Sequence, residues 1–270
     1  KNLEIKTRTS VAAYHGYNFL LARENLTDHL PFDKKVNKIR QRLLKIRAKK
    51  VIVATGSIER PLIFNNNDRP GIILSSAIKK YSDYYGVTCG YENVFFTNND
   101  SAYETAISLF NKGVKVNAIV DIREKAGTNI VNQAEKLGIK IYNSFTIVDT
   151  SGYRRIKNVS IMKLSKDGQS VTGSKTQINC DCLGVSGGWT PAVHLFTQSG
   201  GKLKFDNDDN VFKPNKYPSD QISIGSCNGE FDLDTIVKNF NNNIKTDLGI
   251  DKTNYENLNI STSKEILKKN

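Results

Sequence analysis

The residues that most clearly suggest chemistry are 51–56, which read Val-Ile-Val-Ala-Thr-Gly. Small or β-branched apolar residues run up to the pair Thr55-Gly56, a pattern that predicts a buried parallel strand entering a tight loop. A strand that ends in Ala-Thr-Gly is typical of the place where a chain passes beneath a bound adenine dinucleotide. The segment therefore indicates a cofactor site rather than a catalytic triad or a metal centre.

A complete dinucleotide site also needs a glycine-rich turn before a helix, where the backbone and the helix N-terminus meet the pyrophosphate. The pattern Gly-x-Gly-x-x-Gly occurs nowhere in the chain. The best-placed turn, Thr97–Ala102, contains Asn-Asn-Asp-Ser instead. Asn tolerates a left-handed backbone, so the turn can form, but its side chains crowd a phosphate and Asp100 repels one. We interpret this part as a Rossmann-like module without its ligand, in which Asp121 takes the position of a ribose-binding acid.

The elements that position residues 51–56 begin upstream. Residues 3–24 alternate between apolar and polar and turn at His15-Gly16. Residues 37–49 form another strand-rich segment, in which a short helix is also possible. Together they predict a three-stranded meander that leads into the strand Val51–Ala54. Residues 59–74, which contain Arg-Pro twice, predict an irregular connector.

The middle of the chain alternates between helix and strand patterns, the signature of a parallel sheet with crossover helices. A hairpin, a final strand, and a loop-rich return with one more strand and helix follow. The expected elements are helix Ser75–Tyr85, strand Val94–Thr97, helix Ala102–Lys112, strand Val114–Asp121, helix Asn129–Leu137, strand Ile139–Ile147, hairpin strands Ile156–Leu164 and Ser170–Asn179, strand Cys182–Gly187, strand Ile222–Gly225 and helix Asp232–Asn242.

This order predicts an α/β fold of two Rossmann-like units of the FAD/NAD(P)-binding, pyridine-nucleotide-reductase type, one inserted in the other. Residues 1–84 and 193–245 are expected to form the outer, partial NAD-binding domain, which lacks its N-terminal glycine-rich start. Residues 85–192 are expected to form the inserted domain with its degenerate glycine loop. Residues 246–270 read as a polar tail.

Charge and composition narrow the classes of partner. The net charge of +12 could indicate a nucleic-acid surface, but no basic motif with interleaved aromatic residues accompanies it. We therefore expect no nucleic-acid partner. The dense basic stretch Lys34–Lys50 better fits an acidic partner subunit or an anionic polyglutamyl-type cofactor. No apolar run is long enough to span a bilayer, so no membrane partner is expected.

The cysteines and histidines do not form recognisable sites. Cys89, Cys180, Cys182 and Cys227 include no Cys-x-x-Cys pair, and we interpret them as reduced thiols of a cytoplasmic protein. Cys180 and Cys182 lie in a strand-like run, where alternate side chains are expected to point the same way. The three histidines have no partner at a catalytic or metal-binding spacing. No catalytic residue and no metal ligand are therefore expected.

Several segments together resemble the alpha subunit of heterotetrameric sarcosine oxidase, over residues 1 to about 245. The most specific are Glu-Arg-Pro followed by Asn-Asp-Arg-Pro-Gly, and Thr-Asn-Asn-Asp-Ser-Ala-Tyr in place of the glycine loop. The resembling segments are ATGSIERPLIFNNNDRPG (54–71), FFTNNDSAYETA (95–106), GVSGGWTPAVHLFTQSGGKL (184–203) and IGSCNGEFDLDT (224–235).

The resemblance implies a multi-subunit oxidoreductase that converts sarcosine to glycine and reduces oxygen to hydrogen peroxide. With tetrahydrofolate, the released one-carbon unit becomes 5,10-methylenetetrahydrofolate. The family places FAD on the beta subunit, FMN at the alpha–beta contact and NAD+ on the alpha subunit. The implied partners are the beta, gamma and delta subunits. This chain resembles only the middle of such a subunit, so we expect it to be inactive alone.

The resemblance also implies a set of cofactor-binding residues. The backbone of Val11 would meet the adenine, and Ala54-Thr55-Gly56 would line the adenosine side. In flavin-binding relatives an Asp usually follows the glycine at position 225, so Ser226 fits NAD+ rather than FAD. The full set is Val11, Ala54, Thr55, Gly56, Gly225, Ser226, Phe231 and Leu233, of which the last three form a return loop near the nicotinamide half.

Other interpretations share part of this pattern. Thioredoxin-reductase-like flavoenzymes and the flavoprotein subunits of amine or hydroxyproline dehydrogenases also carry the Ala-Thr-Gly strand. The former normally have a redox Cys-x-x-Cys, which this chain lacks. A scaffold module that binds no nucleotide is the remaining alternative. Because half of the pyrophosphate site is missing, residues 1–270 alone are expected to bind NAD+ weakly or not detectably.

Overall fold

The largest sheet of the protein is parallel. The structure is a computed structural model that describes residues 3–218 and 220–243, and within these residues this sheet has five strands. Its order confirms the parallel sheet that the helix–strand alternation predicts. In space the strands are β6 (Ile72–Leu74), β13 (Cys182–Ser186), β7 (Glu92–Thr97), β8 (Lys115–Asp121) and β9 (Ile141–Asn143).

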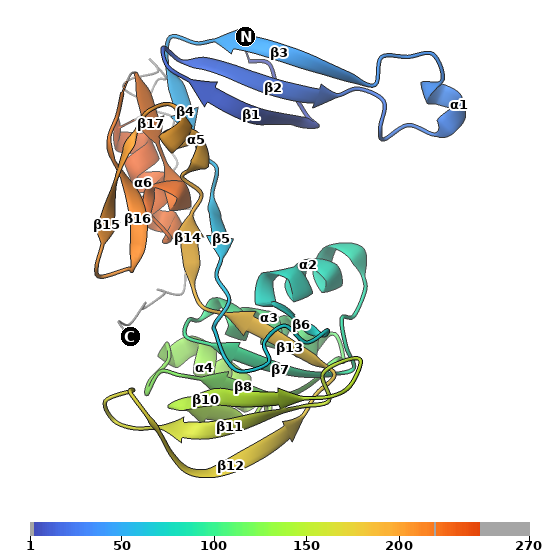
Figure 1. Ribbon diagram of the computed structural model, residues 1–270, viewed down its shortest axis with the longest axis vertical. Helices are drawn as coiled ribbons and strands as arrows, with labels where there is room; N and C mark the ends of the chain where they lie inside the picture. Colours follow the sequence, from blue (N-terminus) through green and yellow to red (C-terminus); the bar gives the residue numbers. More distant parts are fainter. Residues whose placement is uncertain (1–2, 219, 244–270) are drawn as a thin grey trace.

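Helices cover one face of this sheet and a second, antiparallel sheet covers the other (Figure 1). Strand β7 shows why: Phe95 packs into the core on the helical side, whereas Val94 and Phe96 pack into the core on the other side. A strand that is apolar on both faces requires a layer on each. The helices are α2 (Ser75–Tyr85), α3 (Ser101–Asn111) and α4 (Thr128–Lys136), and the strands are β10 (Phe145–Ser151), β11 (Asn158–Leu164) and β12 (Val171–Asn179).

The predicted meander is confirmed as a three-stranded antiparallel sheet of β1 (Thr9–His15), β2 (Phe19–Asn25) and β3 (Gln41–Arg47). The short helix α1 (Phe32–Lys35) lies between β2 and β3. Strand β4 (Val51–Val53) pairs in parallel with β17 (Gln221–Ser223). A third core, which includes Tyr14, Leu20, Val51 and Val53, joins the meander to this pair.

The predicted strand Ile139–Ile147 is wrong as one element. It is divided at Ser144, which has a φ of +59°, into β9 of the parallel sheet and β10 of the antiparallel sheet. The Ser144 amide donates to Arg123 O (3.0 Å), and its carbonyl accepts from the Leu164 amide (2.7 Å). The left-handed residue therefore lets one apolar run serve two sheets, which its alternation alone does not reveal.

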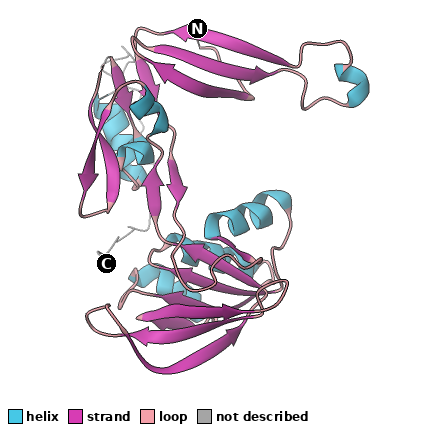
Figure 2. Ribbon diagram, in the orientation of Figure 1, coloured by secondary structure: helices cyan, strands magenta, loops and turns pink. Residues whose placement is uncertain are grey.

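The connector 59–74 and the return after residue 188 are more regular than the sequence predicts. β5 (Ser57–Glu59) pairs with β14 (Trp189–Pro191), and these two strands join the two groups of elements seen in Figure 1 and Figure 2. β13, expected as a final strand, lies between β6 and β7. The return contains α5 (His194–Gln198), β15 (Lys202–Asp206), β16 (Val211–Lys216), the 3-10 turn η1 (Gly225–Asn228) and α6 (Leu233–Asn243).

Two further expectations concern the C-terminal tail and membrane-spanning segments. The predicted polar tail, 246–270, lies outside the described residues. Among the residues that the structure describes, no helix has both the length and the apolar character needed to cross a membrane.

Candidate functional site

The candidate site lies where the parallel strands β4 and β17 end. Val51, Ile52 and Val53 pair with Gln221, Ile222 and Ser223, and the Ile224 amide extends the ladder by donating to Val53 O (3.0 Å). Because the strands are parallel, their carboxyl ends meet at one edge. In open α/β sheets, ligands bind outside the carboxyl ends of the strands.

Both strands leave this edge through a glycine with a left-handed backbone. Gly56 has a φ of +77° and Gly225 a φ of +72°. Residues with a Cβ rarely adopt such angles, so these turns require glycine. A Cβ built on Gly56 would lie 4.0 Å from Ser226 Oγ. The turn after β4 and the turn after β17 therefore lie next to each other.

Hydrogen bonds hold both turns in place. Thr55 Oγ1 donates to Ala192 O (2.7 Å), and the Ala192 amide donates back to Gly56 O (3.0 Å). On the other side, the buried Cys227 thiol donates to Val53 O (3.2 Å). The Glu230 amide donates to Gly225 O (3.3 Å), which closes the loop that leads to α6. The Thr55–Gly56 turn is thus fixed by residues far away in the sequence.

The predicted return loop continues into a helix. Asp232 caps α6, because its carboxylate accepts from the Thr235 amide (2.9 Å) and from Thr235 Oγ1 (2.7 Å). Phe231 is half-buried and Leu233 is exposed. Both lie within a few residues of Ser226, so the return loop is contiguous with the Gly56–Ser226 contact.

Val11 is the candidate that the structure does not bring to this contact. It lies in β1, pairs with Ala22, and stands beside the register shift between Val11 and Ala13. Its side chain is 39% exposed. Among the described residues, no hydrogen bond joins it to Gly56 or Ser226. Its predicted role in meeting an adenine stays a prediction.

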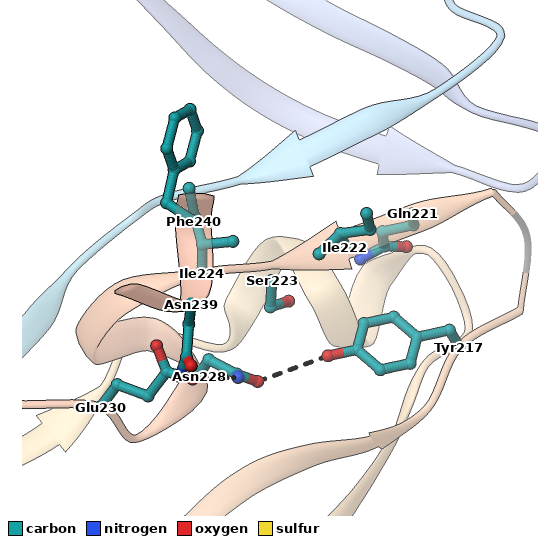
Figure 3. Close-up of a pocket in the computed structure, with 9 residues that line it drawn as sticks. All are labelled: Tyr217, Gln221, Ile222, Ser223, Ile224, Asn228, Glu230, Asn239 and Phe240. Carbon is teal, nitrogen blue, oxygen red and sulfur yellow. Dashed lines mark hydrogen bonds between the residues drawn. The ribbon is translucent and has the colours of Figure 1, made fainter. Parts of the chain in front are cut away.

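A pocket of about 380 Å³ lies beside β17 (Figure 3). Consecutive residues of this strand line it, so it runs along the strand edge opposite β4 rather than under one face of the sheet. Gln221 Nε2 and Ser223 Oγ are buried there, and neither atom has a hydrogen-bond partner among the residues that the structure describes. The lining residues are Tyr217, Gln221, Ile222, Ser223, Ile224, Asn228, Glu230, Asn239 and Phe240.

Sequence reasoning missed Gln221 and Ser223. The available sign was the alternation Gln-Ile-Ser-Ile at 221–224, because a strand buried in a parallel sheet is usually apolar throughout. Gln221 Oε1 accepts from Ser199 Oγ (2.8 Å), so only Gln221 Nε2 and Ser223 Oγ are left for a further polar group to satisfy.

The turn of the second unit is filled by its own side chains. Asn99 Oδ1 accepts from the Ser101 amide (3.1 Å) and from Ser101 Oγ (2.6 Å), at the N-terminus of α3. Asn99 Nδ2 donates to Ser186 O (3.2 Å) across to β13. Trp189 Nε1 donates to Ser101 Oγ (3.2 Å). The helix N-terminus that would receive a pyrophosphate is therefore capped internally.

The carboxylate of Asp121, at the predicted ribose position, is also occupied by neighbouring side chains. It is fully buried and pairs with Arg123 (2.8 Å), which also pairs with Asp100 (2.8 Å). The Tyr103 hydroxyl donates to Asp121 (2.8 Å). Burial alone would lower the pKa of Arg123, but the hydrogen bond and charge of Asp121, with those of Asp100, raise it above its ordinary value. The guanidinium thus remains charged between two carboxylates, and Asp121 has no capacity left for a ribose.

The thiols are not set up for redox chemistry. Burial raises the pKa of Cys180 and of Cys182 to about 12. The expectation that these two side chains point the same way is wrong: Cys182 packs on the helical side of the parallel sheet and Cys180 on the other side. The reason is that β13 begins at Cys182, so strand alternation does not extend back to Cys180.

Solved structures share this fold. The chain is similar to thioredoxin reductase from T. acidophilum, with a TM-score of 0.56 and 17% identity over 83% of this chain and 67% of that one. It is also similar to a NAD-dependent persulfide reductase from A. fulgidus (TM-score 0.54, 13% identity, 84% of this chain and 39% of that one). L-proline dehydrogenase from P. horikoshii gives a TM-score of 0.51 at 18% identity, over 81% and 36% of the two chains. At these identities the similarity shows an α/β fold of the FAD/NAD(P)-binding type.

Sequence relatives are more specific, although no family model matches the chain. Sarcosine oxidase subunit alpha from Corynebacterium sp. (strain P-1) is 34% identical over 83% of this chain, and that from strain U-96 is 32% identical over 83%. The subunit from Rhizobium meliloti (strain 1021) is 33% identical over 74%. The chain spans 19–23% of the length of these relatives. Over the segment that it shares with them, the chain belongs to the family of sarcosine oxidase alpha subunits.

Proposed function

We propose that this chain is the NAD+-holding part of a sarcosine oxidase alpha subunit. The observation that carries the proposal is the contact between the Gly56 turn and Ser226 at the carboxyl ends of β4 and β17. These turns offer backbone groups and a hydroxyl, and no carboxylate lies between Gly225 and Glu230 to repel a pyrophosphate. The turns therefore suit binding of a dinucleotide better than acid–base catalysis.

We propose that residues 1–84 and 193–245 contain an outer, partial NAD-binding domain that another stretch of polypeptide completes. Residues 72–84 are an exception, because β6 and α2 belong to the five-stranded parallel sheet and its helical layer. The pocket along the edge of β17 supports this, because Gln221 Nε2 and Ser223 Oγ have no hydrogen-bond partner among the described residues. A parallel sheet is normally buried and has more than two strands. A further strand beside β17 would bring a glycine-rich turn to the carboxyl edge, next to Gly56 and Ser226.

Residues 85–192, together with β6 and α2, would then form an inserted domain that serves as a scaffold. The capped turn at Asn99 and the buried Asp100–Arg123–Asp121 group support this role, because they occupy the N-terminus of α3 and the position of a ribose acceptor. Trp189, bonded to Ser101, ties this domain to the β5–β14 connection.

In the whole enzyme, this part would hold NAD+ while sarcosine is oxidised elsewhere. The proposed reaction gives glycine and hydrogen peroxide, and 5,10-methylenetetrahydrofolate when tetrahydrofolate is present. FAD and FMN would belong to the assembled complex with the beta, gamma and delta subunits. The chain itself would contribute positioning rather than a reacting group.

The test measures NAD+ in the complete alpha subunit and in residues 1–270 alone. The complete subunit should retain NAD+ on purification, detected by mass spectrometry, whereas the shorter chain should bind weakly by calorimetry. Ser226→Asp should weaken NAD+ binding by the complete subunit at least about tenfold, because the resemblance associates an Asp at this position with flavin rather than with NAD+. Ser170→Asp, at an exposed position in the inserted part, is the matched control. Unchanged binding by Ser226→Asp would refute the site.

A flavoprotein reductase is the second candidate, because the thioredoxin reductase similarity covers most of this chain. It requires bound flavin, so a yellow preparation with one flavin per chain would favour it over NAD+. A complete subunit that binds neither nucleotide would favour the third possibility, a scaffold module.

A further inference from the structure

Most of the net charge of the protein lies in one short segment. Residues 33–50 contain nine Lys and Arg residues and a single acid, Asp33, so they contribute +8 of the chain's +12. The segment includes all of α1 except Phe32, and the whole of β3. Such a concentration of one sign of charge produces a local field that acts on an approaching partner.

Only part of this charge is neutralised within the protein. Asp28 pairs with Arg40 (2.6 Å), and Glu24 pairs with Arg42 (3.7 Å). Among the residues that the structure describes, no ion pair within 4.0 Å involves Lys34, Lys38, Lys45 or Lys49. All four of these lysines are exposed.

Exposed apolar side chains are interspersed with these lysines. Leu43 is 60% exposed, and Ile46 is also exposed. Leu43 lies opposite Arg23 and Ile46 opposite Leu20, so the two side chains are on opposite faces of the sheet. In the loop around α1, Phe32, Val36 and Ile39 are exposed as well. A surface this apolar within so short a segment marks an interaction site.

The position of β3 suits contact with a partner. It is one of the two edge strands of the β1–β2–β3 sheet, and this sheet with α1 extends away from the rest of the molecule (Figure 1). Lysines on an edge strand can simply prevent aggregation. That role explains Lys45 but not the large aliphatic side chains exposed on both faces, which favour a partner that encloses the edge.

We propose that α1 and β3 form a docking arm for an acidic, partly apolar groove on another subunit. Charge complementarity defines the partner, and the aliphatic side chains favour protein over nucleic acid, whose interfaces are more polar. The inference rests on the proposed function, because that function supplies a multi-subunit assembly. It adds the surface through which this chain would join the assembly.

The experiment measures assembly of the complete alpha subunit with the beta, gamma and delta subunits of the same organism. Wild type is compared with Lys34→Glu/Lys38→Glu/Lys45→Glu. A matched control reverses three other exposed lysines, Lys136, Lys157 and Lys204. The arm variant should associate with the other subunits at least about tenfold more slowly than wild type. As the salt concentration rises, the association rate should fall strongly for wild type and the control but not for the arm variant. Leu43→Ala should dissociate about tenfold faster.

The outcomes separate the two proposals. If wild type joins none of the three subunits, the proposed function fails and the inference falls with it. If wild type assembles and the arm variant assembles equally fast, the inference alone is overturned. It is also overturned if the arm variant assembles normally but loses binding to duplex DNA or to phosphatidylserine vesicles. Unchanged circular dichroism and melting temperature establish that each variant is folded.

Discussion

Gly56 and Ser226 are 170 positions apart in the chain, yet a Cβ on Gly56 would lie 4.0 Å from Ser226 Oγ. The parallel pairing of β4 with β17 creates this contact, since it places both turns at one edge. The two residues are the part of the candidate site that the tertiary structure assembles, and the first prediction concerns them.

Gly56→Ala should lower both stability and NAD+ binding. The φ of +77° costs a residue with a Cβ about 1–2 kcal/mol, and relaxation of the turn would displace it from Ser226. Gly86→Ala is the matched control, because Gly86 has a φ of +64° and open space around it. Urea unfolding should show similar losses for both variants, and calorimetry on the complete subunit should show weaker NAD+ binding for Gly56→Ala alone. Equal weakening by both would mean that the effect is global.

Arg123→Met should destabilise the protein by about 3–5 kcal/mol, because it leaves Asp100 and Asp121 as buried charges without their partner. Lys115→Met, which breaks the exposed pair with Glu92, should cost less than about 1 kcal/mol. Denaturant unfolding compares the two. The triple change Asp100→Asn/Asp121→Asn/Arg123→Met should recover part of the loss. A loss below 1 kcal/mol for Arg123→Met would contradict the role given to this cluster.

Asp83 should titrate well below an ordinary aspartate. Hydrogen bonds from Lys112 and then Lys79 lower its pKa from 3.8 to about 2. A lowered pKa means that the stabilisation is complete above pH 4 and is lost as the pH falls through about 2. The side chain is 37% exposed. Because solvent screens its charge, we expect Asp83 to contribute only roughly a few tenths of a kcal/mol to the free energy of unfolding.

Carbon-13 NMR of the Asp83 carboxyl group measures this pKa directly. Lys112→Ala should raise it more than Lys79→Ala does, because the Lys112 contact is the shorter, at 2.5 Å against 3.0 Å. A native pKa close to 3.8 would show that neither lysine is held in place.

The thiols should be inert in the native protein. Cys180 and Cys182 have a pKa of about 12 and are buried, and Cys227 is buried as well. At pH 8, Ellman's reagent should therefore label these three only after unfolding, with half-buried Cys89 reacting first. Rapid labelling of a pair of thiols, or oxidation to a disulfide in the folded state, would instead support a thioredoxin-reductase-like role.

Local sequence patterns located many elements. Helix Ser75–Tyr85 has the predicted bounds, and β7, α3, β8 and α4 lie within two residues of theirs. Helical and strand periodicities arise from side chains a few positions apart, so they can be read from short windows. The Ala-Thr-Gly strand and the absent glycine turn were visible for the same reason.

Patterns that depend on distant partners were not predictable. The three-residue strands β5 and β6 are defined by their pairing with β14 and β13. The local sequence, with its two Arg-Pro pairs, gives no indication of this pairing. Ser144 divides one apolar run because Arg123 and Leu164 bind its backbone. The separate packing of Cys180 and Cys182 depends likewise on where β13 begins.

The sequence by itself determined the fold class, the family and which turns lack the glycines of a pyrophosphate site, because these follow from residue types and short spacings. Only the tertiary structure decided that Gly56 lies beside Ser226 and that Asn99 and Arg123 close the second unit's site. It also decided that, among the described residues, Gln221 Nε2 and Ser223 Oγ have no partner at the edge of β17. These features depend on hydrogen bonds and burial between residues far apart in the chain, which no local pattern encodes.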